Sequence, residues 1–171
     1  CNNMLLSSQI EAGGYRITNE ETNFSELVST CVQDFMTRFP QHIIRPAVNE
    51  ELFVQGDRLL LQMLVNNLID NAIKYAPKEL PVTVDLHEEN NRIILQVMDE
   101  GKGISDEEKQ KIFTKFYRVG NAATKAAKGT GLGLYLSKKI ARQHNANISV
   151  TDNTPAGSIF TVELNSFTEK R

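Results

Sequence analysis

Apolar residues recur at helical spacing in three stretches of the chain, residues 24–39, 56–77 and 132–144. Each stretch predicts a helix that buries one face. Asn23 and Glu26 form a capping-box-like start for the first helix, and prolines close the first two. The pattern therefore predicts three amphipathic helices spread over most of the chain.

Short apolar runs, some of them alternating with polar residues, predict strands between these helices. Residues 82–87 and 92–99 are separated by a turn at 88–91, which indicates a hairpin. Residues 19–23, by contrast, are polar throughout and predict a loop. The stretches predicted as strands are residues 15–18, 42–48, 51–55, 82–87, 92–99, 147–150 and 158–164.

Three further segments belong neither to the long amphipathic helices nor to the strands. Residues 1–12 are loosely helical and stop at the glycine pair 13–14, which predicts the tail of a helix that begins further upstream. Ser105 and Glu108 predict a short capped helix. Residues 118–128 contain small residues and scattered cations without a period, and they predict a mobile segment.

The second amphipathic helix carries polar residues above an apolar floor. Asn67, Asn71 and Lys74 fall within a sector about 60° wide, and Leu60 and Met63 occupy the same sector one and two turns earlier. A carboxamide oxygen is a hard ligand that suits Mg²⁺, and a nearby lysine can meet phosphate charge. A surface helix that tolerates two asparagines is the alternative, and this pattern alone leaves both interpretations open.

Two glycine-containing segments add candidate ligand chemistry. Asp99 ends an apolar strand and precedes Gly101 and Gly103, where the backbone can approach a ligand. Its ionised carboxylate can accept a hydrogen bond from an amino group such as that of adenine. The GTGLG segment at 129–133 opens a helix whose N–H groups suit phosphate oxygens, although it matches neither a P-loop nor a Rossmann fingerprint. A common Asp-Glu-Gly turn and a flexible hinge are the alternatives.

Composition narrows the class of protein. The 171 residues suffice for one well-cored domain, and a net charge of −2 without a basic block argues against nucleic-acid binding. No apolar run is long enough for a membrane span, and no leader is present, so the chain itself is expected to be soluble. Cys1 and Cys31 lack metal-ligand spacing and fit a reducing compartment. The start at Cys1 rather than Met predicts a piece of a longer protein.

Four motifs, taken in order, closely resemble the catalytic, ATP-binding domain of bacterial sensor histidine kinases, within the gyrase, Hsp90, histidine kinase and MutL superfamily. Residues 67–76 (NLIDNAIKYA) are similar to the N box, 99–104 (DEGKGI) to the first glycine box, 112–118 (IFTKFYR) to the F box and 129–134 (GTGLGL) to the second glycine box. The resemblance covers roughly residues 20–165. It implies an α/β fold of the Bergerat type, an α+β two-layer sandwich with helices on one face of a mixed sheet.

The resemblance implies that the chain binds Mg·ATP, and it assigns roles to the motif residues. Asn71 is expected to coordinate Mg²⁺, Asn67 to support the metal and phosphates, and Lys74 to contact phosphate. Asp99 is expected to accept from the adenine amino group, and Arg118 to meet the γ-phosphate. The other residues expected to bind the nucleotide are Tyr75, Gly101, Gly103, Ile104, Phe116, Gly129, Thr130, Gly131, Leu132 and Gly133.

The implied function is that of a sensor histidine kinase, which donates the γ-phosphate of ATP to a histidine on a dimerisation hairpin. Hydrolytic relatives of the gyrase and Hsp90 type resemble one another in a glutamate at the first N-box position. Asn67 stands there in this chain, which favours phosphotransfer over an ATPase. A non-catalytic nucleotide-binding regulatory module is the third alternative. Because the acceptor hairpin is missing, the chain alone is not expected to phosphorylate itself.

Three ring-bearing residues are expected to be structural. His87 is followed by Glu88, as in the acceptor motif, but it comes after the N box, and we expect an exposed residue at a strand end. His144 is expected to cap its helix or to face solvent. Phe113 is expected in a small core or as an anchor of the lid.

The domain organisation follows from the same resemblance. Residues 1–14 are expected to end a dimerisation helix, 15–166 to form the catalytic domain, and 167–171 to be a tail. The ATP lid is expected at about 104–130. The parent protein is expected to be a homodimer that serves the receiver domain of a response regulator, with this domain in the cytoplasm. The parent itself is expected to lie in the inner membrane.

Overall fold

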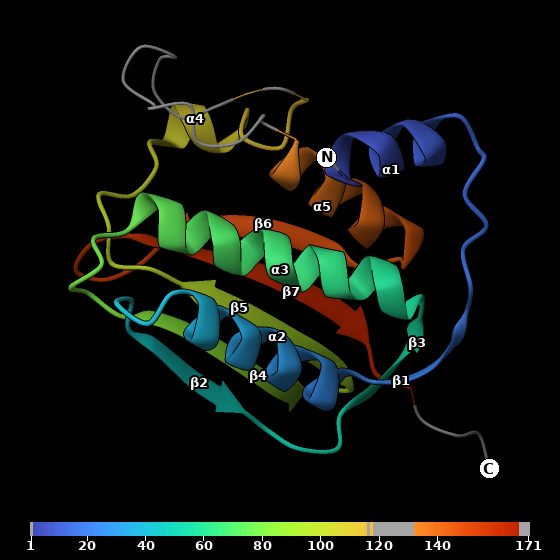
Figure 1. Cartoon of the computed structure of the whole chain (residues 1–171), viewed down its shortest axis with the longest axis horizontal. Coiled ribbons are helices and arrows are strands. Elements are labelled where there is room, and N and C mark those ends of the chain that lie inside the picture. Colours follow the sequence, from blue (N-terminus) through green and yellow to red (C-terminus); the bar gives the residue numbers. More distant parts are fainter. Residues whose placement is uncertain (1, 116, 118–131, 168–171) are drawn as a thin grey trace.

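The computed structural model describes residues 2–115, 117 and 132–167. Figure 1 shows two layers, a β-sheet and a group of helices on one of its faces. The helices are α1 (Asn2–Glu11), α2 (Phe24–Arg38), α3 (Arg58–Tyr75), α4 (Asp106–Lys109) and α5 (Gly133–Gln143). The strands are β1 (Glu20–Asn23), β2 (Ile44–Val48), β3 (Phe53–Gly56), β4 (Val82–Glu89), β5 (Arg92–Met98), β6 (Asn147–Asp152) and β7 (Ser158–Asn165).

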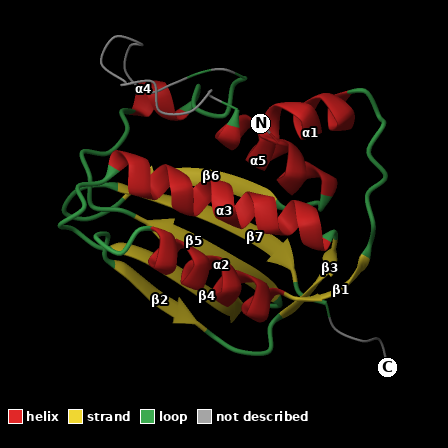
Figure 2. Ribbon diagram, viewed as in Figure 1, coloured by secondary structure: helices red, strands yellow, loops and turns green. Residues whose placement is uncertain are grey.

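The main sheet has five strands in the order β2-β4-β5-β7-β6. β2 runs parallel to β4, and the other neighbours are antiparallel, so the sheet is mixed. β1 and β3 form a separate antiparallel pair. Figure 2 shows α2, α3 and α5 over the same face of the main sheet. The predicted α/β sandwich with one covered face is confirmed.

Alternation along the central strands separates the covered face from the open one. Val82, Val84 and Leu86 are buried in β4, while the residues between them are half-buried. β5 and β7 repeat this pattern. Because successive side chains of a strand point to opposite faces, one apolar set from each strand faces the helices. Leu64 and Leu68 of α3 have no exposed surface and pack in the same core.

The predicted helix starts and the predicted hairpin are present. Asn23 Oδ1 accepts a hydrogen bond from the Glu26 N–H at 3.0 Å, and Ser105 Oγ accepts one from the Glu108 N–H at 3.2 Å. β4 and β5 pair antiparallel around a two-residue turn at 90–91, where both asparagines have positive φ. Asparagine tolerates this left-handed region, as a tight hairpin turn requires.

One strand prediction is wrong. Residues 15–18 form no strand, whereas the polar segment 20–23, expected as a loop, forms β1 and pairs with β3. Tyr15 and Thr18 instead donate hydrogen bonds from the hydroxyl and the backbone N–H to Asp57 Oδ2, at 3.1 and 3.0 Å. A carboxylate from a distant part of the chain therefore takes the Thr18 N–H, a backbone donor that a strand would offer to its neighbour.

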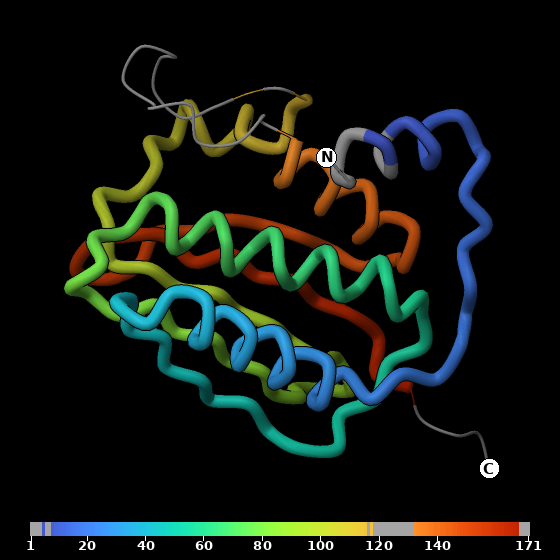
Figure 3. Tube along the Cα trace, in the orientation of Figure 1, coloured from blue at the N-terminus to red at the C-terminus, as the bar shows by residue number. Residues whose placement is uncertain are grey.

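Asp57 joins three parts of the molecule. Its side chain caps α3 by accepting from the Leu60 N–H at 3.0 Å, and it also holds Tyr15 and Thr18. Both residues belong to the connection between α1 and β1, which Figure 3 shows running along one side of the molecule. Burial alone raises the pKa of Asp57, but the hydrogen bonds from Leu60, Thr18 and Tyr15 outweigh it and hold the pKa below its usual value.

His144 connects the same point to the end of α5. Its Nδ1 lies 2.8 Å from the Ile140 carbonyl oxygen, and its Nε2 accepts a hydrogen bond from the Asp57 N–H at 3.0 Å. Because an accepting nitrogen carries no proton, the proton of the neutral ring is on Nδ1 and is donated to Ile140. His144 therefore caps its helix, which was the first of the two alternatives expected for it. It is half-buried and does not face solvent fully.

Replacing Asp57 with alanine is expected to lower the free energy of unfolding by about 2 kcal/mol, because a helix cap is lost and buried donors lose their acceptor. Urea denaturation followed by circular dichroism measures this change. Asp34→Ala is the control, since the exposed Asp34–Arg38 pair contributes at most about 0.5 kcal/mol. Equal stability of the two variants would contradict the prediction. With its lowered folded-state pKa, Asp57 stabilises the protein above its unfolded pKa, and this contribution is lost as the pH falls through the folded value.

Two composition-based expectations can be placed in the structure. Cys31 lies in α2 with 2% of its surface exposed, and burial, with a smaller effect of Asp34, raises the pKa of its thiol to about 11. The thiol is thus a core group that stays protonated. In the described part of the chain, no helix has the length and apolar character needed to cross a bilayer.

Candidate functional site

α3 carries the predicted ligand residues at the border of the core. Asn67 and Asn71 are half-buried, on a helix that Asp57 caps and whose apolar face packs inward. Because these two asparagines are only half-buried, little of their polar surface is removed from water. Their amide groups stay accessible from one side. The predicted apolar stripe beside them is fully buried and consists of Leu61, Leu64, Leu68 and Ala72.

A narrow cavity brings several of the predicted residues together. It lies between α3, the segment after β5, the start of α5 and β7. The residues that line it are Asn71, Tyr75, Asp99, Lys102, Gly103, Ile104, Leu134, Ser158 and Phe160. Five of these were expected at a nucleotide site from sequence alone, namely Asn71, Tyr75, Asp99, Gly103 and Ile104. Residues far apart in the chain thus share one concave site.

The cavity is small in this structure. Its volume is about 40 Å³, which is room for a few water molecules. Ile104 and Leu134 contribute half-buried apolar walls. A planar base therefore needs these walls to separate before it can enter fully.

Of the described residues that line this cavity, Asp99 is the only one with a carboxylate. It follows β5 with 5% of its surface exposed, and its Oδ1 accepts a hydrogen bond from the Gly101 N–H at 2.9 Å. Burial raises the pKa of Asp99, against the lowering effect of backbone hydrogen bonds from Gly101 and Ser158. A buried acceptor of this kind suits a ligand that brings its own N–H donor.

Binding of an amino-bearing base at this cavity is expected to weaken as the pH falls through the raised pKa of Asp99, because a protonated carboxyl is a poorer acceptor for that amino group. Since the folded pKa lies above the unfolded one, the ligand-free protein changes in the opposite sense and loses stability as the pH rises between the two values. Calorimetric titration with Mg·ATP between about pH 4 and 7, the range of carboxyl titration, measures the affinity. A constant affinity down to the usual carboxyl pKa would contradict the prediction.

Gly101 allows the first glycine box to lie against the end of α3. A Cβ at this position would lie 2.7 Å from the Tyr75 carbonyl oxygen and 3.2 Å from Asp99 Oδ1. Both distances are below normal van der Waals contact, and the first involves rigid backbone. The absence of a side chain at Gly101 is therefore what lets Tyr75 and Asp99 approach each other.

Asn67 connects α3 to the second glycine box. Its Nδ2 donates a hydrogen bond to the Gly133 carbonyl oxygen at 3.2 Å. Ser137 Oγ donates to the same oxygen at 2.8 Å. Leu132, just before Gly133, is 1% exposed. The N box and the start of α5 are thus held together directly, at a place where helix N–H groups become available to an anion.

The remaining predicted site residues are not all brought to the cavity. Lys74 forms an ion pair with Asp70 at 2.9 Å between Nζ and Oδ2, and it does not line the cavity. A contact from Lys74 to a phosphate requires this surface pair to open. The predicted site residues Phe116, Arg118, Gly129, Thr130 and Gly131 lie outside the described residues, as does most of the predicted lid.

Sequence reasoning missed four lining residues, Lys102, Leu134, Ser158 and Phe160. Lys102 and Leu134 lie within matched motifs but have no distinctive residue type. Ser158 and Phe160 lie on the covered face of β7, where alternation predicts core residues. The sequence predicted that both residues lie on a strand, but a position on a strand does not indicate contact with a ligand.

The two other residues expected to be structural have identifiable packing. Phe113 packs edge-to-face on Phe160, with ring centroids 6.2 Å apart, and so supports the cavity wall from behind. His87 lies on the open face of the sheet in β4. Its Nδ1 is 2.6 Å from Asp85 Oδ1 and its Nε2 is 3.6 Å from Glu89 Oε1. The side chain of His87 is 32% exposed, so the residue is half-buried rather than exposed as expected, because two carboxylates partly cover its ring.

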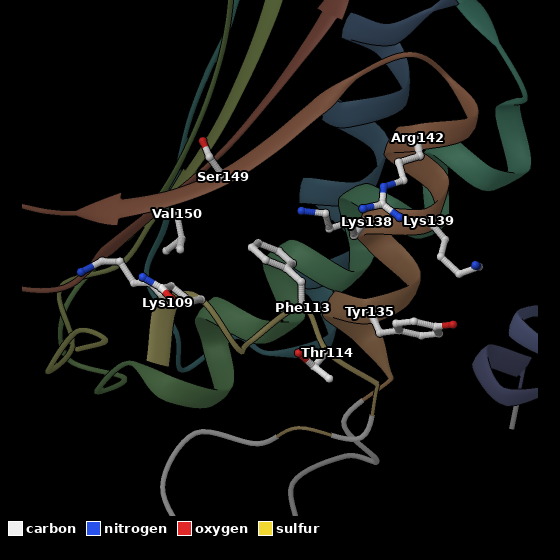
Figure 4. A pocket seen from close by; sticks show the side chains of 10 residues that line it. Lys109, Phe113, Thr114, Tyr135, Lys138, Lys139, Arg142, Ser149 and Val150 are labelled. Atoms are coloured by element: carbon white, nitrogen blue, oxygen red, sulfur yellow. The ribbon is translucent and has the colours of Figure 1, made fainter. Parts of the chain in front are cut away.

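A second, broader depression of about 600 Å³ lies between α5, the segment after α4 and β6. Figure 4 shows the Phe113 ring projecting into it, with Lys138 and Arg142 on the α5 side. Lys138 Nζ lies 5.3 Å from the centroid of that ring. Lys109, at the opposite side, is neutralised by Asp106 and Asp152. Among the described residues that line the depression, none was predicted to bind the nucleotide.

The helix α1 contacts the rim of this depression. Glu11 accepts a hydrogen bond from the Tyr135 hydroxyl and forms an ion pair with Lys115 at 3.2 Å. These bonds lower the pKa of Glu11, the bond from Tyr135 most strongly. The end of α1 is thus attached to α5, the helix that follows the second glycine box.

Comparison with known proteins finds sensor kinases among the proteins that are similar to this chain. Residues 56–167 match the family described as histidine kinase-, DNA gyrase B- and HSP90-like ATPase. The chain is 30% identical over 159 residues to the sensor protein KdpD of Clostridium acetobutylicum, and 31% over 167 residues to the sensor histidine kinase WalK of Bacillus subtilis. These matches cover 92% and 95% of this chain but only 18% and 27% of the two relatives.

A solved structure extends the similarity to the fold. The mycobacterial sensor histidine kinase MprB superposes with a TM-score of 0.78 at 25% sequence identity, and the match covers 89% of this chain and 100% of that one. The match therefore extends over the whole of that solved chain and over most of this one.

Proposed function

Since the chain belongs to the histidine kinase-, DNA gyrase B- and HSP90-like ATPase family and its relatives are sensor histidine kinases, we propose that it binds Mg·ATP and donates the γ-phosphate to a histidine of its parent protein. The observation that carries the proposal is the cavity shared by Asn71, Tyr75 and Asp99. It combines a buried carboxylate, an aromatic side chain and a carboxamide, which match the base and metal ends of Mg·ATP.

The base end of the nucleotide belongs beside Asp99. Its carboxylate accepts from the adenine amino group, and guanine presents a carbonyl oxygen at the equivalent ring position, which Asp99 repels. Tyr75 packs beside the nucleoside, and Ile104 with Gly103 closes the pocket around the base. Specificity for adenine then arises from one buried acceptor whose desolvation is offset only by the correct donor.

The metal end belongs beside Asn71. The amide of Asn71 lines the cavity and makes no hydrogen bond within the described part of the chain, so its oxygen is available. No cluster of three or more His, Cys, Asp or Glu side chains occurs among the described residues, and a metal ion here would take its other ligands from phosphates and water. Bound Mg²⁺ supplies neutralisation of phosphate charge.

The phosphate groups belong along the second glycine box. Asn67 supports this segment through Gly133, and Lys74 meets a phosphate once its surface pair with Asp70 opens. Gly101 is assigned to shaping the base end and Phe116 to binding the nucleotide. The residues assigned to the phosphates by their place in the motifs are Arg118, Gly129, Thr130, Gly131, Leu132 and Gly133.

Phosphotransfer is favoured over hydrolysis by the chemistry of Asn67. An amide cannot take a proton from water, and the Nδ2 of Asn67 already donates to Gly133. Asp99, the only carboxylate lining the described cavity, is assigned to the base rather than to the γ-phosphate. With no general base for water among the described residues of the cavity, the nucleophile has to arrive on another segment, which is the arrangement of a histidine kinase.

The parent protein supplies the remaining parts of this function. We assign α1, within residues 1–14, to the end of a dimerisation helix, because it docks on α5 through Glu11. The catalytic unit is residues 15–166, and its partners are the acceptor hairpin and, through its histidine, a response regulator receiver domain. We place this unit in the cytoplasm, in a homodimeric parent.

A melting curve with a non-hydrolysable Mg·ATP analogue tests binding. At about 100 times the Kd, the analogue is expected to raise the free energy of unfolding by about 2.7 kcal/mol. The unmutated protein with no ligand-dependent change would refute the proposal. Because the curve reports binding only, it also separates the nucleotide site from any later chemical step.

Label transfer tests the reaction. The chain is mixed with a separately made fragment that carries the upstream acceptor helix and with ATP labelled on the γ-phosphate. Label is expected on the histidine of the fragment. Binding without transfer would identify a regulatory module, and steady-state hydrolysis that a single carboxylate substitution abolishes would identify an ATPase.

A further inference from the structure

The turn between β6 and β7 is built against the backbone of Asp99. Asn153 Nδ2 donates a hydrogen bond to the Asp99 carbonyl oxygen at 2.8 Å, and the Asp99 N–H donates to the Ser158 carbonyl oxygen at 3.0 Å. The Asn153 N–H closes the turn by donating to the Gly157 carbonyl oxygen at 3.0 Å. Both polar groups of the Asp99 backbone are therefore hydrogen-bonded, one to the turn and one to the first residue of β7.

The turn also packs directly on this backbone. Gly157 has a φ of +106°, and a Cβ at this position would collide with the Asp99 carbonyl oxygen and lie 2.7 Å from Glu100 Cα. At the other end of the first glycine box, a Cβ on Gly103 would lie 3.3 Å from the Gly157 carbonyl oxygen. The turn thus contacts the box that follows Asp99 at both of its ends.

A salt bridge fixes the turn from the other side. Asp152, immediately before Asn153, pairs with Lys109 at 2.8 Å between Oδ1 and Nζ. The same Nζ donates to the Ile104 carbonyl oxygen at 3.0 Å. Hydrogen bonds that Lys109 donates to Asp106 and Asp152 raise its pKa, so the ammonium group stays charged. The turn, Ile104 and the start of α4 are held as one unit.

The amide of Asn153 can make these contacts in only one orientation. Its Oδ1 accepts from the Thr154 N–H at 2.8 Å, so its NH₂ group faces the Asp99 carbonyl oxygen. An aspartate at the same place would keep the acceptor and lose the donor. Two oxygens would then face each other at the distance of a hydrogen bond. Asn153 is therefore matched chemically, as well as sterically, to the backbone of Asp99.

We propose that Asn153 is a positioning residue that sets base specificity by holding the backbone of Asp99, and hence its carboxylate, at the wall of the nucleotide cavity. The inference rests on the proposed function, because the ligand it acts on is adenine. The hydrogen bond that this carboxylate accepts from the base depends on the placement of the carboxylate to within a fraction of an ångström. A shift of the supporting backbone therefore weakens recognition of the base and leaves the phosphate end unchanged.

Asn153→Asp tests this role, with Asn165→Asp at the exposed end of β7 as the charge-matched control. Isothermal titration with the Mg·ATP analogue, its GTP counterpart and magnesium tripolyphosphate measures the base and phosphate contributions separately. We expect ATP affinity to fall about 10-fold or more in Asn153→Asp, with the preference over GTP falling in parallel and tripolyphosphate affinity unchanged. The control is expected to bind all three ligands like the unmutated protein.

Asn153→Ala serves as a second variant, since it removes the donor without adding charge, and circular dichroism verifies that both variants are folded. An ATP-to-GTP preference retained within about twofold in both variants would overturn the inference while leaving the proposed function intact, and so would an equal loss of all three ligands, which a purely structural role predicts. Failure of the unmutated protein to bind ATP would overturn the proposed function and the inference with it.

Discussion

Replacing Asp99 with alanine is expected to reduce the affinity for Mg·ATP by about 2–3 kcal/mol, or roughly 30- to 150-fold, and to remove the preference for adenine over guanine. The physical reason is the loss of a charged hydrogen-bond acceptor in a buried position, where water cannot replace it. The affinity for GTP is expected to stay the same or to increase, because a repulsive partner for its carbonyl oxygen disappears. Titration calorimetry with both nucleotides measures the difference.

The substitution is not expected to unfold the protein. Burial raises the pKa of Asp99, so the ionised carboxylate lowers the free energy of unfolding at neutral pH, and its removal relieves that cost. Asp34→Ala, an exposed aspartate of α2, is the matched control and should bind ATP normally. If Asp99→Ala kept both ATP affinity and base preference, the assignment of this cavity to adenine would be wrong.

Replacing Asn71 with alanine is expected to remove the part of ATP affinity that depends on magnesium, on the order of 2 kcal/mol or about 30-fold, because a ligand to a charged centre is lost. Affinities measured in the presence of Mg²⁺ and of EDTA should become nearly equal in the variant. Binding of adenosine, which carries no phosphate, should be unchanged. Label transfer to the acceptor fragment should fall with the metal-dependent affinity.

Asn66→Ala is the matched control on the same helix. Asn66 is half-buried, and its Oδ1 is buried without a hydrogen-bond partner, so its removal leaves no group newly unsatisfied. This control should keep both its magnesium dependence and its stability. A magnesium effect of full size in Asn71→Ala, or an equal loss in the two variants, would show that the metal is held elsewhere.

Local chemistry made the helices and the hairpin predictable. A cap such as Asn23 and the period of apolar residues act within a few residues, and the asparagine turn at 90–91 joins two strands that follow each other directly. β1 was missed because a polar strand of four residues is stabilised by its pairing with β3, more than thirty residues away, and by the distant Asp57. Nothing within residues 15–23 carries that information.

The same distinction applies to the site. Asn71 and Asp99 lie in motifs with a recognisable local order, and they share the cavity that was expected for them. Asn153 acts on Asp99 across 54 residues, and His144 accepts from Asp57 across 87. These contacts depend on how β6, β7 and α5 are arranged in space. Residue type and spacing identified the groups that we propose to meet the ligand, whereas the groups that hold them in place became visible only in three dimensions.

The uncovered face of the main sheet determines which strand positions can accept substitutions. Its side chains are half-buried and partly polar, as in the contact between Gln96 Nε2 and Thr161 Oγ1 at 3.3 Å, whereas their neighbours Leu95 and Val162 have no exposed surface. Substitutions in β4, β5 and β7 should therefore be accepted at every second position and rejected at the next. Over evolutionary time, the side chains on the uncovered face of these strands can change to suit new neighbours without disturbing the proposed nucleotide site on the other side.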